Sequence, residues 1–126
     1  MENGNEIRLI RPAERTTETI QTAGMTRETA IATGRLWAGH VRAAPDMASG
    51  WHHHGEHETA IYVLGGRVRI EFGSDGSSAV EAVEGDFIHV PPHVVHRELN
   101  PTSEEGRIVV VRGGSGTPVV NVDGPA

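Results

Sequence analysis

The sequence contains no cysteine and no lysine, so the chemistry of both side chains is excluded. Without cysteine there is no disulfide, no thiolate metal ligand and no cysteine nucleophile. All 11 basic residues are arginines. The absence of lysine excludes Schiff-base catalysis and the lysine of a phosphate-binding P-loop.

Long apolar runs and excess positive charge are also missing. No run approaches the roughly 18–20 apolar residues that cross a bilayer, and no basic segment followed by an apolar one opens the chain. We therefore expect a cytoplasmic protein without a membrane partner. The net charge of −6 argues against binding to nucleic-acid phosphates, and we expect no nucleic-acid partner.

The composition that remains is typical of a small all-β protein. A chain of 126 residues suits one domain, which we expect to span residues 1–126. Sixteen glycines and seven prolines indicate many tight turns. Together with the frequent valines, they favour β-structure over helices.

Alternation of apolar and polar residues predicts the individual strands. It is clearest at 67–72, where Val68 and Ile70 share one face and Arg67 and Arg69 the other. The pair Gly65-Gly66 before it predicts a hairpin, and residues 13–27 read as a loop that covers a sheet edge. Roughly nine or ten short strands predict a jelly-roll β-barrel. They include residues 6–11 (an edge strand), 29–33, 34–42, 61–64, 67–72, 79–84, 87–90, 93–99 and 108–111.

Histidines gather in the segment WHHHGEHET at residues 51–59. Imidazole and carboxylate groups are common ligands of divalent transition metals. His52 and His54 are two residues apart, so both side chains point to one face of an extended chain, and His53 points to the other. The segment therefore predicts a metal site rather than a solvated polar loop.

Two stretches resemble the paired motifs of the cupin superfamily, and in particular its small single-domain members. The first motif, G(X)5HXH(X)3,4E(X)6G, is matched by His52, His54, Glu58 and Gly65, although Gly50 lies only two residues before His52. The second, G(X)5PXG(X)2H(X)3N, is matched in order, except that His93 stands where the family usually has glycine. Its matching residues are Gly85, Pro91, His96 and Asn100.

The resemblance implies a barrel with its core at about 30–112, to which the N-terminal strand and the C-terminal tail are accessory. It also implies one divalent ion, of Mn, Fe, Co, Ni, Zn or Cu, with His52, His54, Glu58 and His96 as ligands. Strand parity leaves the fourth ligand open, because Thr59 shares a face with Ile61 and Glu58 takes the opposite face. A β-bulge would turn Glu58 inward. The alternatives are Thr59 or a water at that position, or His57.

Such a site indicates a metal-dependent enzyme that acts on a small organic carboxylate or carbonyl compound. Dioxygenase and decarboxylase or lyase reactions are the leading types. The alternatives are a non-catalytic barrel that binds a small molecule or a metal, and an ion that only braces the fold. The resemblance also implies a homodimer. Val119, Val120 and Val122 of the tail, with the N-terminal strand, would either be exchanged between subunits or complete their own barrel.

Overall fold

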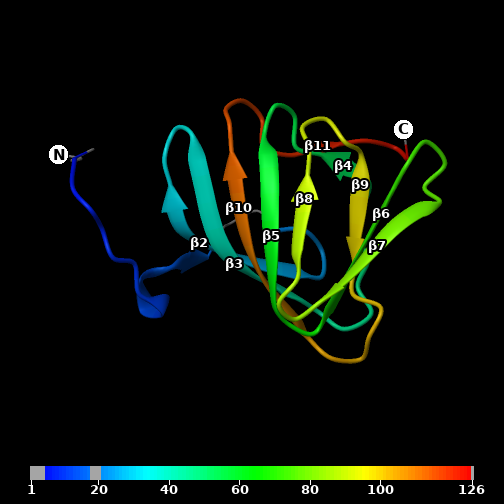
Figure 1. Cartoon of the computed structure of the whole chain (residues 1–126), viewed down its shortest axis with the longest axis horizontal. Helices are drawn as coiled ribbons and strands as arrows, with labels where there is room; N and C mark the ends of the chain where they lie inside the picture. The colour runs from blue at the N-terminus through cyan, green and yellow to red at the C-terminus, as the bar shows by residue number, and fades with distance from the viewer. Residues whose placement is uncertain (1–4, 18–20, 126) are drawn as a thin grey trace.

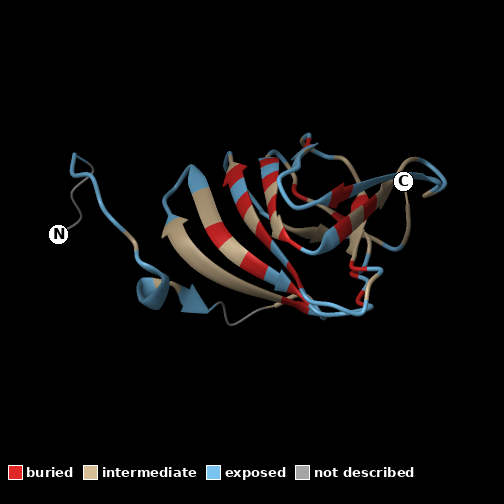
Figure 2. Ribbon diagram, turned by 60° about the horizontal axis from the view of Figure 1, so that its bottom comes forward, coloured by how far each residue is buried: buried red, intermediate tan, exposed pale blue. Residues whose placement is uncertain are grey.

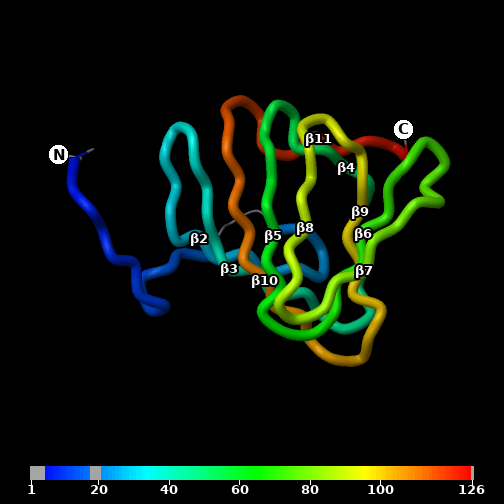
Figure 3. The backbone as a smooth tube through the Cα atoms, in the orientation of Figure 1, coloured from blue at the N-terminus to red at the C-terminus, as the bar shows by residue number. Residues whose placement is uncertain are grey.

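The computed structural model describes residues 5–17 and 21–125, which form two antiparallel sheets facing each other (Figures 1 and 3). One sheet has the spatial order β1 (Thr16–Thr17), β2 (Met25–Ala32), β3 (Leu36–Ala43), β10 (Gly106–Gly113), β5 (Glu58–Gly65) and β8 (Phe87–Val90). The other has the order β11 (Val120–Asn121), β4 (His52–His53), β9 (His96–Leu99), β6 (Arg67–Phe72) and β7 (Ser78–Val83). The predicted all-β jelly roll is confirmed.

The hydrophobic core lies between the sheets, and alternation along each strand builds it. On β5, Ile61 and Val63 are buried, whereas Ala60 is exposed. On β6, Val68 and Ile70 are each 3% exposed, and Arg67 and Arg69 lie on the other face, as their parity predicts. The same alternation appears as bands of buried and more exposed residues along neighbouring strands in Figure 2. Every second side chain on a strand thus lines the interior.

The turn at Gly65-Gly66 differs from the predicted hairpin. Strand β5 belongs to the six-stranded sheet and β6 to the five-stranded sheet, so this turn carries the chain from one sheet to the other. Gly66 has φ +79°, and a Cβ there would lie 2.9 Å from the carbonyl oxygen of Glu105. Glycine is therefore required for the turn, but it does not join paired strands. The hairpin lies one strand later, between β6 and β7.

The N-terminal prediction is wrong at two places. Residues 6–11 form no strand, and Ile7 and Leu9 are 102% and 69% exposed. Alternation alone does not make a strand where no neighbouring strand offers hydrogen bonds. A short 3₁₀ helix, η1 (Pro12–Glu14), follows, and β1 takes the sheet edge beside β2. Strand β2 begins at Met25, inside the predicted loop.

The C-terminal tail packs on its own chain, because β11 pairs antiparallel with β4. Val120 lies opposite His53, and Asn121 lies opposite His52. The tail therefore lies next to the histidine segment. Among the described residues, no helix is long and apolar enough to span a membrane.

Candidate metal centre

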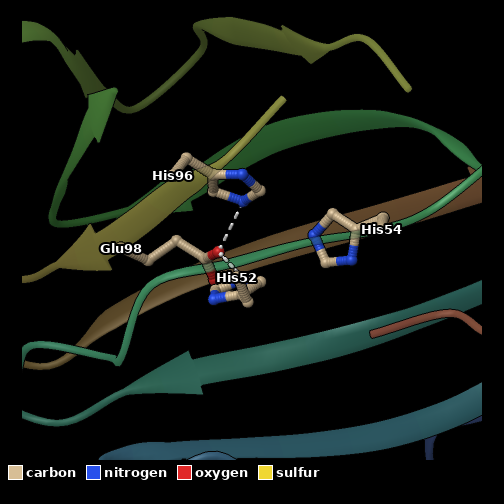
Figure 4. A group of neighbouring side chains, drawn as sticks. All are labelled: His52, His54, His96 and Glu98. Atoms are coloured by element: carbon tan, nitrogen blue, oxygen red, sulfur yellow. Dashed lines mark hydrogen bonds and ion pairs between the residues drawn. The ribbon is translucent and has the colours of Figure 1, made fainter. Parts of the chain in front are cut away.

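Three imidazoles and one carboxylate meet between the two sheets: those of His52, His54, His96 and Glu98 (Figure 4). Each residue offers one ligand atom, and these atoms all lie within 4.8 Å of one another. Strand pairing sets this arrangement, because β4 lies antiparallel to β9 with His52 opposite His96. His96 and Glu98 are two residues apart on β9, so both side chains point into the barrel.

The orientation of each ring is set by a main-chain carbonyl. The Nδ1 atoms of the three imidazoles lie 2.9 Å from Gly50 O for His52, 2.8 Å from Pro118 O for His54 and 2.9 Å from Val94 O for His96. A carbonyl oxygen only accepts, so each Nδ1 carries the proton and donates it. In the neutral ring, Nε2 then keeps a lone pair that faces the centre. This is the outer-shell arrangement that orients histidine ligands of metals.

The carboxylate of Glu98 lies between two of these nitrogens. Its Oε2 is 3.0 Å from Nε2 of His52 and 3.0 Å from Nε2 of His96. With Nδ1 protonated, a neutral ring would direct a lone pair at a carboxylate lone pair, which is repulsive. A proton or a metal cation must therefore lie between them, and the donor set fits a divalent transition metal.

The electrostatics of the metal-free centre follow from the same contacts. Burial would raise the pKa of the Glu98 carboxyl, but its bonds with His52 and His96 outweigh burial and hold that pKa well below 4.5. Burial likewise opposes protonation of His52, yet the bond with Glu98 prevails and raises the pKa of His52 above 6.5. Burial, reinforced by the charge of Arg112, lowers the pKa of His54 to about 3. Glu98 is thus an anion and His54 is neutral at pH 7.

Comparison with known proteins identifies the family. The family described as the cupin domain matches residues 39–112, which is more than half of the chain. The chain belongs to the cupin superfamily. No curated protein matches it.

Solved structures match this cupin at low sequence identity. The polyketide cyclase RemF from Streptomyces resistomycificus is 22% identical, with a TM-score of 0.77 over 93% of this chain and 86% of that one. KdgF from Halomonas sp. is 19% identical, with a TM-score of 0.69 over 86% and 96% of the two chains. The S161A mutant of Bacillus subtilis oxalate decarboxylase OxdC is 20% identical, with a TM-score of 0.69 over 83% of this chain and 30% of that one. At this identity, the matches establish the shared fold.

The predicted ligands fall into two groups in the cupin barrel. His52, His54 and His96 meet as their spacing implies. Glu58 lies elsewhere, because its Oε2 is 2.6 Å from Nε2 of His89 and both side chains are more than 60% exposed. The pairing of β5 with β8 runs without a bulge from Thr59 to Tyr62, so nothing turns Glu58 inward.

Two other candidates for the fourth position are also located. Thr59 points inward and is 2% exposed, and its Oγ1 has no hydrogen-bond partner among the described residues. His57 lies outside the centre, with its Nε2 3.1 Å from Gly116 O. The carboxylate of the centre is instead Glu98, which sequence reasoning missed. The signal was present, since Glu98 is two residues after His96 and so shares its face.

The departure from the second cupin motif has a local explanation. His93, which stands in place of the usual glycine, has φ +65°. That left-handed conformation is one that glycine adopts readily and other residues rarely. The turn of the motif is therefore preserved, with the strain placed on a histidine. Its side chain faces outward, with Nε2 3.0 Å from Oε2 of Glu56.

Two cavities border the centre. The small cavity, of about 30 Å³, is bounded by His52, His54, Glu98 and Thr59, among others. The second cavity, of about 500 Å³, reaches His96 and extends between the sheets. We call it the β7–β8 cavity, after the strands that supply Val80, Ala82, Ile88 and Val90 to its walls. The centre is therefore inside the barrel, yet it has space beside it.

Proposed function

We propose that this cupin is a metal-dependent enzyme that holds one divalent transition metal ion through His52, His54, His96 and Glu98. One observation carries the proposal. Three imidazoles, each oriented by a carbonyl on the far side of its ring, and the carboxylate of Glu98 offer four ligand atoms that all lie within 4.8 Å of one another. Orienting three rings in this way has no benefit for a solvated polar cluster. It suits an ion that takes all four donors.

The space beside the centre supports an enzyme over an ion that only braces the fold. A structural ion needs protein ligands and no room for anything else. Here the β7–β8 cavity of about 500 Å³ reaches His96, and it is within the size range of small-molecule sites. We infer that the substrate is a small organic molecule which enters this cavity.

The division of labour between ion and protein follows from the contacts. The bound ion would supply a Lewis acid to a substrate oxygen. The Gly50, Pro118 and Val94 carbonyls keep the imidazoles in the ligating tautomer. Glu98, held as an anion, neutralises part of the ion's charge. The mainly apolar walls lower the local dielectric constant, which strengthens the electrostatic interactions inside.

Oxygenation and decarboxylation or lyase chemistry remain the proposed reaction types. A ligand set of histidines and one carboxylate is compatible with either. The similar structures include a polyketide cyclase and an oxalate decarboxylase, which supports an enzymatic use of this fold. A barrel that binds a small molecule without turnover is the competing function.

The experiment has two stages. Elemental analysis of the purified protein, before and after chelation and reloading with each of Mn²⁺, Fe²⁺, Co²⁺, Ni²⁺, Cu²⁺ and Zn²⁺, should give one ion per chain. An ion at 100 times its Kd should then add about 2.7 kcal/mol to the free energy of unfolding. The loaded protein is next assayed with keto acids, diketones and phenols by oxygen electrode and product mass spectrometry. Turnover that disappears on chelation supports the enzyme, whereas a full ion complement without turnover supports the non-catalytic barrel.

A further inference from the structure

The walls of the β7–β8 cavity are mainly apolar. Inward-facing side chains from three strands line it: Ile70 and Phe72 of β6, Val80 and Ala82 of β7, and Ile88 and Val90 of β8. Half of these lie deep in the barrel, since Ile70, Ala82 and Val90 are 3%, 4% and 5% exposed. Val80, 41% exposed, lies at the rim. The cavity is thus an apolar space with an opening to solvent.

The polar groups around this space already have partners. Glu81 lies 3.2 Å from Arg67 and 2.9 Å from Arg69. His89 lies 2.6 Å from Glu58. Asp86 accepts a hydrogen bond from the main-chain N–H of Val83, with Oδ2 2.9 Å away.

No arginine belongs to the described residues that line the cavity. Arg67 and Arg69, which pair with Glu81 of the lining, are on the outer face of β6. A ligand body in the cavity would therefore meet mainly aliphatic and aromatic carbon, and it would find no arginine to balance a negative charge. At the inner end, His96 is the one histidine of the metal centre that also lines this cavity.

We propose that the β7–β8 cavity binds a neutral, largely hydrocarbon molecule of ring-system size, with a single hydroxyl or carbonyl oxygen directed at His96. This inference rests on the proposed function for the role of that oxygen, but the selection by the walls does not depend on the ion. A neutral body gains from burial against the apolar side chains. A carboxylate placed there would be desolvated without a partner, which is strongly unfavourable.

The apolar walls therefore distinguish two substrate classes, charged acids and neutral oxygen compounds, that are both compatible with the ligand set. A dicarboxylate has a second charged end, so with one carboxylate directed at His96 it would have to bury the other beside Val80, Ala82 or Ile88. Phenols, cyclic ketones and similar compounds carry one oxygen at the end of an apolar body. The geometry favours the second class.

The test uses 2-naphthol and 2-naphthoate at pH 7, two probes with the same ring system and different charge. Binding is measured by calorimetry on protein stripped of metal, so that no ion attracts the carboxylate. We expect saturable binding of 2-naphthol at one site and a Kd for 2-naphthoate at least about tenfold weaker.

A matched pair of variants locates the binding. Val80→Phe fills the rim of the cavity, whereas Val83→Phe makes the same change on the same strand at a residue that is 44% exposed and outside the cavity lining. Val80→Phe should weaken 2-naphthol binding at least about tenfold, and Val83→Phe should leave it within about twofold. Thermal unfolding of both variants verifies that they fold.

Three results would overturn the inference: equal affinity for the two probes, no binding of 2-naphthol, or equal effects of the two variants. The outcome is independent of the metal measurement. Selective binding of 2-naphthol in a protein that takes up no ion would sustain the cavity and end the enzyme proposal. One bound ion per chain with equal affinity for the two probes would leave the enzyme proposal standing and overturn the inference about the cavity.

Discussion

Oε2 of Glu98 lies 3.0 Å from Nε2 of His52, and this contact joins the two strands that build the candidate metal centre. The other nitrogen of His52 is hydrogen-bonded to Gly50 O, so a cation must share the space between the carboxylate and the ring. In the metal-free protein that cation is a proton, which is why the pKa of His52 is raised. The same carboxylate is the part of the centre that the cupin motif does not specify.

Glu98→Gln should abolish tight metal binding, and Glu58→Gln should not. The amide introduced by Glu98→Gln would present a weaker, neutral donor to the ion, whereas Glu58 faces His89 on the outer surface. We expect the Kd for the ion to rise at least about 100-fold in Glu98→Gln, since even outer-shell partners change metal affinity 10–100-fold. Titration calorimetry on protein stripped of metal measures the Kd of both variants. Loss of affinity in Glu58→Gln would restore Glu58 as the ligand.

His54 should make the metal-free protein sensitive to acid. Its pKa is about 3 in the folded chain and near 6.5 in the unfolded chain. Between these values the unfolded chain binds the extra proton, so stability is complete above pH 6.5 and falls as the pH decreases towards 3. The expected loss from this group between pH 7 and pH 5 is about 2 kcal/mol.

His54→Asn isolates that contribution, because the Asn amide does not titrate and its N–H can still donate to Pro118 O. Urea unfolding of both proteins at pH 7, 6 and 5 gives the comparison. The raised pKa of His52 changes stability with pH in the opposite direction, but this contribution is common to both proteins. Parallel pH profiles for the two proteins would show that His54 is not kept neutral by the fold.

Thr59→Val should stabilise the metal-free protein. The Thr59 hydroxyl is buried and has no partner among the described residues, so valine of the same shape removes a desolvated polar group. We expect the free energy of unfolding to rise by about 1 kcal/mol. The matched control is Thr29→Val, which removes the acceptor 3.2 Å from Nε1 of Trp37 and should lower stability by about 1 kcal/mol. A loss of stability in Thr59→Val would mean that its hydroxyl is hydrogen-bonded in solution.

Asn100 of the second cupin motif should be a structural requirement rather than a ligand. It is fully buried, and its Nδ2 donates to Ala43 O at 3.2 Å and to Glu104 O at 2.7 Å. Asn100→Asp would direct a carboxylate at two carbonyl oxygens, so we expect a loss of about 3 kcal/mol or more at pH 7. The same change at exposed Asn121 should cost less than about 0.5 kcal/mol. Denaturant unfolding measures the stability of both variants. An unchanged stability in Asn100→Asp would contradict the role of Asn100 as a buried hydrogen-bond donor.

Most of the fold prediction rested on the alternation of apolar and polar residues along single strands. Residues 67–72 became β6 with Val68 and Ile70 inside, and His52 and His54 face the interior as their spacing requires. These are properties of neighbours along one strand, which sequence records directly. The expected homodimer stays a prediction, and sedimentation velocity on the metal-loaded protein checks it.

Two predictions that depended on which strands pair with each other were wrong. Gly65-Gly66 was correctly placed at a turn, but the turn joins two sheets instead of two paired strands. Residues 6–11 alternate like a strand, yet they have no strand pairing. In both cases the deciding hydrogen bonds are made with residues far away in the sequence.

The all-β class, the inward faces of the strands and three histidines of the centre can be predicted from the sequence, because each depends on period-two spacing or on a local motif. Which glutamate joins these histidines depends on the tertiary structure. Glu58 and Glu98 are both close in sequence to a histidine of the cluster. Local spacing places Glu98 on the face of His96, but only the pairing of β9 with β4 brings its carboxylate to His52. The unbroken pairing of β5 with β8 then keeps Glu58 outside. Long-range strand register, which no short segment encodes, selected between two otherwise similar side chains.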